Sequence, residues 1–182
     1  GVLASVGLER VPVFKRPRVS IISTGDELIP PGEDLQPGKI WDINSYSLAA
    51  AAAEDGAFPI LGGIVPDDRA TIKTKVMDAL TKSDALLISG GSSAGARDYT
   101  AEIINELGRP GVLAHGISIK PGKPTIIGGV DGKPVIGMPG QPVSSLVVYN
   151  VVVSPLIRRM AGQADRPKSE YTAVCDENYY SA

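Results

Sequence analysis

The sequence predicts an α/β fold in three layers (αβα), with a mostly parallel sheet and helices on both of its faces. Stretches typical of buried strands alternate with stretches typical of helices, in the order β, α, β, α, β, α. Each helix is long enough to carry the chain back across the sheet, so the strands that it joins are expected to run parallel. Glycine-rich turns and acidic residues follow these strands, and open α/β sheets bind ligands at the carboxyl ends of their strands.

Composition limits the kind of protein. The chain has 182 residues, 43% of them hydrophobic, which suffices for one well-packed domain with short flanking pieces. A net charge of −2 argues against a nucleic-acid partner. The sequence contains no signal peptide and no apolar run of about 18 residues, which argues against a membrane partner. The single cysteine, Cys175, allows no internal disulfide and is typical of a cytoplasmic protein.

Three segments are expected along the chain. Residues 1–17 are predicted to be a linker from a preceding domain, because they are irregular and end in a basic, proline-containing stretch. Residues 18–162 are predicted to form the α/β domain. Residues 163–182 turn polar and are expected to be a second linker and the start of a truncated C-terminal domain. Because the chain begins at Gly1 without an initiator Met, we expect it to be a piece of a longer protein.

The first part of the chain holds three predicted strands and three predicted helices. A run of alanines strongly favours the first helix, and Gly56 is a natural stop after it. Val19, Ile21 and Ile22 make the first strand apolar, and residues 86–88 do the same for the third. The strands are expected at 18–24, 58–65 and 83–89, and the helices at 45–55, 69–82 and 99–107.

From residue 112 the pattern changes to short strands. They are expected at 112–119, 125–130 and 135–137, with Asp131-Gly132 as a hairpin turn between the last two. A long helix is predicted to follow and to end at Met160. Pro142 lies near its first position, where a missing N–H is tolerated.

Pairs of acidic residues follow two of the predicted strands. Asp26 and Glu27 follow the first strand, and Asp67 and Asp68 follow the second, directly before a helix. A solvated turn with a helix cap explains such acids as well as a binding role does. Capping explains one acid of the second pair but less readily both.

The third strand runs into a turn of small residues. Its glycines let a ligand approach backbone N–H groups closely, and the following helix N-terminus favours negative charge, so the turn is a natural seat for phosphate or another oxyanion. Asp98 closes the turn, where it either caps the helix or holds Mg²⁺ against a phosphate. The turn residues are Gly90, Gly91, Ser92, Ser93 and Gly95.

A second candidate anion site is the loop Lys120-Pro121-Gly122-Lys123-Pro124. Prolines and a glycine hold its two lysines in a short, stiff segment that suits phosphate or a tetrahedral oxyanion, although surface lysines are often simply solvated. His115 stands alone without a paired Ser or Cys motif, which favours a structural role over a catalytic one.

The acids, the glycine turn and the lysines together predict one crevice. It would hold a phosphorylated ligand whose charge is shared between Mg²⁺ and ammonium groups. The sequence contains neither a Walker-type phosphate loop nor a Gly-x-Gly-x-x-Gly motif, so it supports neither a P-loop NTPase nor a dinucleotide-dependent oxidoreductase.

Six motifs in the chain carry a family resemblance. They are Ser23-Thr24-Gly25-Asp26-Glu27-Leu28, Asp42-Ile43-Asn44, Gly63-Ile64-Val65-Pro66-Asp67-Asp68, Ser89-Gly90-Gly91-Ser92-Ser93-Ala94-Gly95 with Asp98-Tyr99, Lys120-Pro121-Gly122-Lys123-Pro124, and Met138-Pro139-Gly140-Gln141-Pro142-Val143-Ser144. In order and spacing they resemble the molybdopterin molybdenumtransferases, the MoeA-type enzymes to which the gephyrin E-domain belongs. The resemblance covers residues 11–162 and implies the central molybdopterin-binding domain of the MoaB/Mog type. Residues from 170 onward are similar to the start of the C-terminal β-domain.

The resemblance implies a reaction in which molybdate is inserted into the dithiolene of adenylylated molybdopterin, the anhydride is hydrolysed, and AMP and molybdenum cofactor are released. It implies Glu27, Asp67 and Asp98 as the functional acids, the last two as candidates for Mg²⁺ or for hydrolysis. Ser93 and the glycines around it would hold the pterin or the nucleotide phosphate. The remaining implied binding residues are Lys120, Lys123, Pro124 and Ser144 around molybdate, together with Gly140.

Two departures from the family pattern occur. Gln141 stands where the family commonly has Asn, and Ser92-Ser93-Ala94 replaces Val-Ser-Val or Val-Ser-Met. Two other functions remain open: a MogA-type molybdopterin adenylyltransferase, and a non-catalytic sensor of molybdopterin or molybdate. The Asp98-Tyr99 pair and the lysine loop favour insertion over adenylyl transfer. The resemblance also implies a homodimer and a MogA-type partner. Because another domain completes the family's site across the dimer, we expect weak or no turnover from this chain alone.

Overall fold

The computed structural model describes residues 1–90, 94–164 and 172–174, and the side chains of all of them except residues 94–98. Its main element is a six-stranded sheet in the order β4-β1-β5-β8-β7-β6. Four strands run parallel, and β7 and β6 complete the sheet in antiparallel pairing, so the predicted α/β class with a mostly parallel sheet is confirmed. The strands are β1 (Arg18–Thr24), β4 (Phe58–Val65), β5 (Ala85–Gly90), β6 (Pro110–His115), β7 (Ile126–Val130) and β8 (Lys133–Met138).

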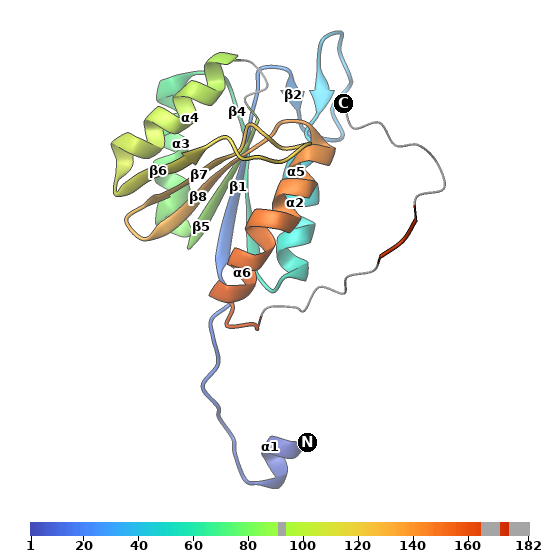
Figure 1. Ribbon diagram of the computed structural model, residues 1–182, viewed down its shortest axis with the longest axis vertical. Helices are drawn as coiled ribbons and strands as arrows, with labels where there is room; N and C mark the ends of the chain where they lie inside the picture. Colours follow the sequence, from blue (N-terminus) through green and yellow to red (C-terminus); the bar gives the residue numbers. More distant parts are fainter. Residues whose placement is uncertain (91–93, 165–171, 175–182) are drawn as a thin grey trace.

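Helices cover both faces of the sheet (Figure 1). One face carries α2 (Asn44–Glu54) and the continuous segment of α5 (Pro142–Val148), the π-helical turn η1 (Tyr149–Val153) and α6 (Ser154–Met160). The other face carries α3 (Arg69–Lys82) and α4 (Ala94–Leu107). Successive strand residues point to opposite faces, so Ile21 and Leu87 enter the first core while Ile22 and Ile88 enter the second.

Three parallel strands end at one level, which we call the carboxyl edge. Thr24 at the end of β1 pairs with both Val65 of β4 and Gly90 of β5. A two-stranded arm of β2 (Leu28–Ile29) and β3 (Ile40–Trp41) lies next to this edge (Figure 1). The loops that follow β1, β4 and β5 therefore all start side by side.

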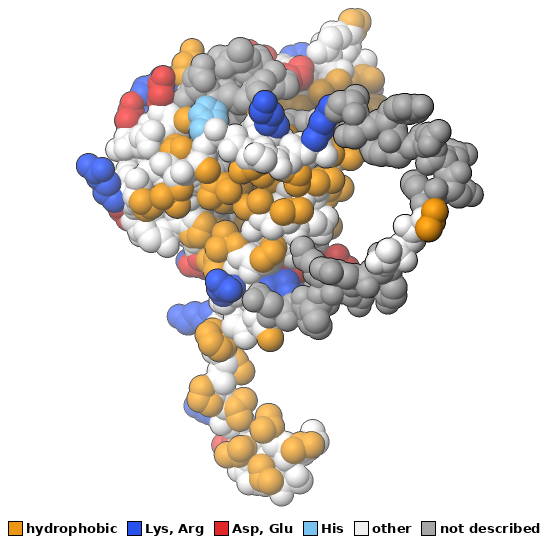
Figure 2. All heavy atoms as spheres, viewed as in Figure 1, with side chains coloured by type: hydrophobic (Ala, Val, Ile, Leu, Met, Phe, Trp, Pro, Cys, Tyr) orange, Lys and Arg blue, Asp and Glu red, His pale blue; other side chains and the backbone are white. Residues whose placement is uncertain are grey.

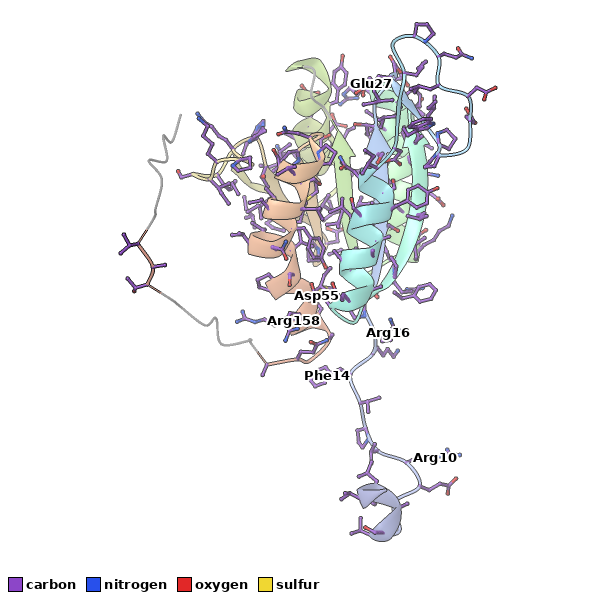
Figure 3. All side chains as sticks on the ribbon, turned by 90° about the vertical axis from the view of Figure 1, so that its right-hand side faces the viewer. Arg10, Phe14, Arg16, Glu27, Asp55 and Arg158 are labelled. Carbon is purple, nitrogen blue, oxygen red and sulfur yellow. The ribbon has the colours of Figure 1, made fainter. Side chains whose placement is uncertain are left out.

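The N-terminal segment reaches the domain at the opposite end of the sheet (Figure 3). It contains α1 (Val2–Ser5) and then runs without helix or strand to β1. The Arg16 guanidinium donates to the carbonyls of residues 56 and 57 at 3.2 and 2.8 Å. Asp55 lies nearby, 3.8 Å from the Arg158 guanidinium. Residues 1–17 thus leave the carboxyl edge uncovered, while the domain boundaries stay a prediction.

Several boundaries differ from the prediction. α4 begins at Ala94 rather than at residue 99. β6 ends at His115 rather than at residue 119, because Gly116 has a φ of +90° and turns the chain. The long helix contains η1, which no periodicity in the sequence signals. Within the described ranges, none of the helices has the length and apolar character needed to cross a lipid bilayer.

Candidate functional site

A cavity of about 510 Å³ opens at the carboxyl edge, and we call it the edge cavity. Its floor consists of the ends of β1 and β5, the start of α2 and the loop before α5. Its wall is the arm of β2 and β3. Three predicted site residues line it, namely Glu27, Gly90 and Gly140. The cavity therefore lies where an open parallel sheet is expected to bind a ligand.

The wall of the edge cavity is mostly apolar. Leu28, Leu35, Ile40 and Trp41 line it together with Lys39, and Trp41 is 45% exposed. The indole Nε1 donates to the Glu33 carbonyl at 3.1 Å, which fixes the ring on the arm. A flat apolar wall opposite a polar floor suits a planar ring that carries polar substituents.

Asn44 connects the parts of the cavity floor. Its side-chain nitrogen donates to the Ser89 hydroxyl at 2.7 Å and to the Gly140 carbonyl at 2.8 Å. These two bonds join the start of α2 to the end of β5 and to the loop before α5. Its side-chain oxygen Oδ1 is buried and has no hydrogen-bond partner among the described residues. Asn44 therefore both positions the floor and leaves one buried acceptor unused.

Asp42 holds the start of α2, which forms part of the cavity floor, against β1. Its carboxylate is buried, and it accepts hydrogen bonds from the Ser23 hydroxyl at 2.9 Å and from the Ser45 backbone N–H at 3.1 Å. The second bond satisfies an N–H in the first turn of α2. Asp42 thus ties α2 to β1 and acts as a structural residue of the motif at 42–44.

Acidic residues from two loops meet beside the edge cavity. The Asp67 backbone N–H donates to Asp26 Oδ1 at 3.1 Å, which joins the loop after β4 to the loop after β1. Gly25 has a φ of +153°, and a Cβ there would lie 2.7 Å from the Glu27 carboxylate. Only glycine lets that carboxylate fold back over the turn. We call Asp26, Glu27 and Asp67 the edge acids.

The two members of the Asp67-Asp68 pair have different roles. Asp68 is the N-cap of α3 and accepts from the Thr71 N–H at 2.8 Å and the Thr71 hydroxyl at 2.6 Å, which lowers the pKa of Asp68. Asp67 Oδ1 is buried and has no hydrogen-bond partner in the described part of the chain. Burial raises the pKa of Asp67, and the charges of Glu27 and Asp26 raise it further. Capping thus explains Asp68, and Asp67 remains available for a ligand.

The edge acids suit Mg²⁺. Proteins commonly bind Mg²⁺ with one or two carboxylates, and water and substrate phosphates complete its octahedral shell. Asp67 Oδ1 offers a partnerless oxygen close to two further negative charges. No group of three or more His, Cys, Asp or Glu side chains among the described residues could hold a metal ion alone, so ligand oxygens would have to contribute. Asp98, the other predicted ligand, is in the first half of α4, and its side chain lies outside the described part.

The glycine turn after β5 is described only at its two ends. Gly90 has a φ of +135°, and a Cβ there would lie 2.2 Å from the Thr24 carbonyl oxygen of the neighbouring strand. No side chain can be accommodated at that distance. Gly91, Ser92 and Ser93 lie outside the described residues, and Gly95 is in the first turn of α4. The proposed phosphate seat stays a prediction.

The two loop lysines do not line the edge cavity. Lys120 and Lys123 line a second cavity of about 540 Å³ together with His115, and we call it the lysine cavity. A Cβ at Gly122 would lie 2.6 Å from Val148 Cγ2, so the loop packs directly on α5. Pro124 follows Lys123 in the same loop. The described residues of the predicted crevice thus line two cavities. Because the turn at 91–93 lies outside the described residues, the single crevice stays a prediction.

The first turn of α5 lies between the two cavities. Gln141 lines the edge cavity, and its Oε1 accepts from the Ser144 hydroxyl at 2.6 Å. The Ser144 carbonyl oxygen is 3.8 Å from the position of a Cβ on Gly122 in the lysine loop. Ser144 therefore lies between Gln141 and the lysine loop without lining either cavity, and its hydroxyl is bonded to Gln141.

Sequence reasoning missed three residues of the two cavities. Asn44 and Trp41 belong to a stretch to which no ligand role was given, and His115 is exposed on the lysine cavity rather than buried in a core. In the structure Asp42 accepts from the Ser45 N–H in the first turn of α2, and the Asn44 side chain binds the floor instead. Nothing local marks Trp41 or His115, because only the packed fold brings them to a cavity.

The geometry is that of an α/β ligand-binding domain whose site lies at the carboxyl edge of a parallel sheet. A sequence profile described as "Probable molybdopterin binding domain" matches residues 20–159. The chain belongs to this molybdopterin-binding domain family.

Curated relatives agree with this assignment. A molybdopterin molybdenumtransferase of Nostoc sp. is 39% identical over 166 residues, which covers 90% of this chain and 38% of the relative. One from Haemophilus influenzae is 34% identical over 181 residues, which covers 99% of this chain and 44% of the relative. The chain therefore spans about two fifths of the length of these relatives.

Solved structures resemble the fold closely. The molybdopterin biosynthesis MoeA protein of Pyrococcus horikoshii superposes with a TM-score of 0.79 at 45% identity, over 89% of this chain and 40% of that one. A molybdenum cofactor biosynthesis protein B superposes with a TM-score of 0.62 at 20% identity, over 83% of this chain and 97% of that one. The second likeness concerns the fold alone.

Proposed function

We propose that this chain is the ligand-binding domain of a molybdopterin molybdenumtransferase. In the proposed reaction molybdate is inserted into the dithiolene of adenylylated molybdopterin, water hydrolyses the anhydride, and AMP and molybdenum cofactor leave. The observation that carries the proposal is the position of the first turn of α5, which separates a cavity bordered by acids from a cavity lined by lysines. A ligand with a phosphate end and an oxyanion end needs both environments.

The edge cavity is proposed to hold the pterin and its phosphates. The ring would lie against Trp41 and Ile40, and its polar edge would face the Asn44 floor. Backbone N–H groups of the turn at 90–95, with the Ser92 and Ser93 hydroxyls, would bind phosphate oxygens. This part of the site binds and orients the substrate and excludes water from the ring.

The edge acids are proposed to serve hydrolysis. Glu27 lines the cavity, and Asp67 is joined to the same turn through Asp26. The raised pKa of Asp67 makes its carboxylate a better proton acceptor for an attacking water than an ordinary aspartate. Asp67 and Asp98 would hold Mg²⁺, which would neutralise charge on the phosphates when it is bound. Asp67 Oδ1 is the atom proposed to contact either the ion or the water, because no protein group in the described residues satisfies it.

The lysine cavity is proposed to hold molybdate. Molybdate is a tetrahedral dianion, and ammonium and hydroxyl groups bind such ions through charge-assisted hydrogen bonds. Lys120, Lys123 and Ser144, with Pro124 stiffening the loop, would supply these donors. Ser144 would have to turn its hydroxyl away from Gln141, so we expect Gln141 to tune molybdate binding.

The assembly is part of the same proposal. Residues 163–182 would lead into a C-terminal β-domain, and a homodimer would complete the site with another domain. The protein would be cytoplasmic and would receive its adenylylated substrate from a MogA-type adenylyltransferase. The 182-residue chain alone would then bind ligand with weak or no turnover.

The test is AMP release from adenylylated molybdopterin incubated with molybdate and Mg²⁺, for the full-length protein and for the 182-residue chain. Molybdate-dependent release by the full-length protein supports the proposal. Consumption of ATP instead would assign adenylyl transfer, and binding without turnover would assign a sensor. Appreciable molybdate-dependent turnover by the 182-residue chain would contradict the need for further domains.

A further inference from the structure

We propose that His115 is a third cationic donor of the lysine cavity and makes oxyanion binding stronger below neutral pH. The inference rests on the proposed function, because it takes the lysine cavity as the oxyanion site. It adds a residue to which neither the family profile nor the named relatives assign a role, and it adds a pH dependence to that site.

The lining of the lysine cavity has one sign of charge. Lys120, Lys123 and His115 are its titratable residues, and none of the described residues that line it is acidic. The chain as a whole has a net charge of −2, so this local excess of positive charge is not a general property of the surface. Figure 2 shows the histidine and nearby basic side chains on one face of the molecule. None of the described residues that line this cavity would oppose a bound dianion with a carboxylate.

Backbone hydrogen bonds hold the histidine segment against the lysine loop. The Gly116 N–H donates to the Thr125 carbonyl at 2.8 Å, and the Ile117 N–H donates to the Lys123 carbonyl at 2.9 Å. Inside the loop the Thr125 hydroxyl donates to the Gly122 carbonyl at 2.7 Å. The two sides of the cavity are therefore joined by the backbone, so the backbone positions that carry the imidazole and the ammonium groups keep a fixed separation.

The surroundings of His115 leave it free to respond to a bound anion. Its neighbour strand β7 carries no charged residue. α4 packs behind β6, and its acids Glu102 and Glu106 pair with Arg69 and Lys73 of α3 rather than with the histidine. The side chains of residues 94–98 at the start of α4 lie outside the described part. Among the described residues that line the cavity, Lys120 and Lys123 are the charged groups that share it with the imidazole.

An imidazole titrates near pH 6.5 in water, so it is the side chain that changes charge within the physiological range. When protonated, both of its nitrogens donate, and one donor can reach a tetrahedral oxyanion held by the lysines. By linkage, an anion that prefers the imidazolium must also hold the proton on the ring more tightly. The chain contains one His, so both effects can be read without interference from another imidazole.

The experiment is titration of the 182-residue chain with molybdate by calorimetry at about pH 6 and about pH 8, repeated with sulfate, which remains a dianion throughout. We expect molybdate to bind roughly five-fold more tightly at the lower pH. At both pH values, His115→Gln should bind molybdate with the affinity that the parent shows at the higher pH. Leu113→Gln is the matched control, because Leu113 is exposed two residues before His115 in β6 but does not line the cavity, and it should keep the five-fold ratio.

A second readout uses the NMR signal of the single imidazole. Saturating molybdate should move its titration midpoint to higher pH, by the logarithm of the ratio between the affinities of the imidazolium and imidazole forms for molybdate. An affinity that does not change with pH, or a pH dependence that survives His115→Gln, overturns this inference and leaves the proposed function standing if Lys123→Ala still abolishes binding. Absence of molybdate binding at both pH values overturns the inference and the proposed oxyanion site together.

Discussion

Two groups of acidic residues in this domain have opposite electrostatic surroundings. On the outer face of α3 and α4, Arg69 pairs with Glu102 at 3.2 Å and also with Glu106, and Lys73 Nζ lies 3.0 Å from Glu106. The hydrogen bond from Lys73, together with Arg69, lowers the pKa of Glu106. These charges are neutralised within the fold, so we call Glu102 and Glu106 the paired acids.

The edge acids have no such partners. Among the described residues, no ion pair involves Asp26, Glu27 or Asp67. Burial and mutual repulsion raise the pKa of Asp67 instead of lowering it. The comparison teaches that a fold can neutralise its acids where they only hold helices together, and that it leaves charge uncompensated where a cation and a phosphate are expected to arrive together.

The largest expected effect comes from breaking the floor that holds the edge acids. Gly90→Ala would drive a Cβ into the Thr24 carbonyl, so we expect a loss of about 3 kcal/mol or more of stability. Gly132→Ala is the control, because Gly132 also has a positive φ but nothing within 4 Å, and it should cost only about 1 kcal/mol. Chemical denaturation measures the free energy of unfolding of both variants. Equal losses of stability would show that backbone strain, and not the contact with β1, matters at Gly90.

Asp67→Asn should lower molybdate-dependent AMP release by the full-length protein about 100-fold, because it removes the charge proposed to act on the ion or the water. Glu106→Gln removes a paired acid and should leave the rate within about two-fold. Steady-state kinetics with saturating Mg²⁺ measure the rate of AMP release by both variants. If the two variants behave alike, the distinction between edge acids and paired acids has no functional meaning.

Asn44→Ala tests the polar floor beside the edge acids. It leaves the Ser89 hydroxyl and the Gly140 carbonyl without their donor, so we expect a loss of about 2 kcal/mol, or a drop of roughly 4–8 °C in Tm. Asn150→Ala is the matched control, since Asn150 is exposed and donates only to the Leu146 carbonyl, and it should cost about 0.5 kcal/mol or less. A small effect at Asn44 would mean that the floor does not depend on it.

The smallest expected effects are changes in Tm, and they should have opposite signs for the edge acids and the paired acids. The raised pKa of Asp67 means that its ionised form destabilises the fold, a cost present at pH 7 and relieved as pH falls toward the ordinary value of 3.8. Asp67→Asn should therefore raise Tm slightly at pH 7, by about 2 °C or less, with the gain shrinking toward pH 4.

Glu106 should behave in the reverse way. Its lowered pKa contributes stability that is present above its ordinary value of 4.5 and is lost as pH falls below it. Glu106→Gln should lower Tm at pH 7, and the deficit should shrink in acid. Thermal melts of Asp67→Asn and Glu106→Gln between pH 7 and about pH 4 test both expectations. Changes in Tm of the same sign for the two variants would remove the electrostatic contrast between the edge acids and the paired acids.

The layered architecture could be predicted from the sequence because its signals are local. Apolar runs closed by glycine or proline identified every strand of the main sheet, and the alanine run identified α2. Boundaries were wrong where tertiary contacts decide them. β6 ends at His115, where Gly116 turns the chain with a φ of +90° although its N–H still donates to the Thr125 carbonyl beside β7.

The site could be predicted only in part. Glu27, Gly90 and Gly140 follow strands or precede a helix, so their common edge could be inferred from the order of elements. The separation of the lysines into a second cavity depends on how Gly122 packs on Val148, which no spacing reveals. Asn44 was missed for the same reason, since its partners Ser89 and Gly140 are distant in the chain.

The central claim is that the edge acids are left unpaired for a cation that binds with a phosphorylated ligand. The most direct measurement is calorimetric titration of AMP into the 182-residue chain with and without Mg²⁺, for the parent, Asp67→Asn and Glu106→Gln. We predict that Mg²⁺ strengthens AMP binding about ten-fold in the parent and in Glu106→Gln but by less than about two-fold in Asp67→Asn. An equal effect of Mg²⁺ in all three proteins, or none in the parent, would contradict the account.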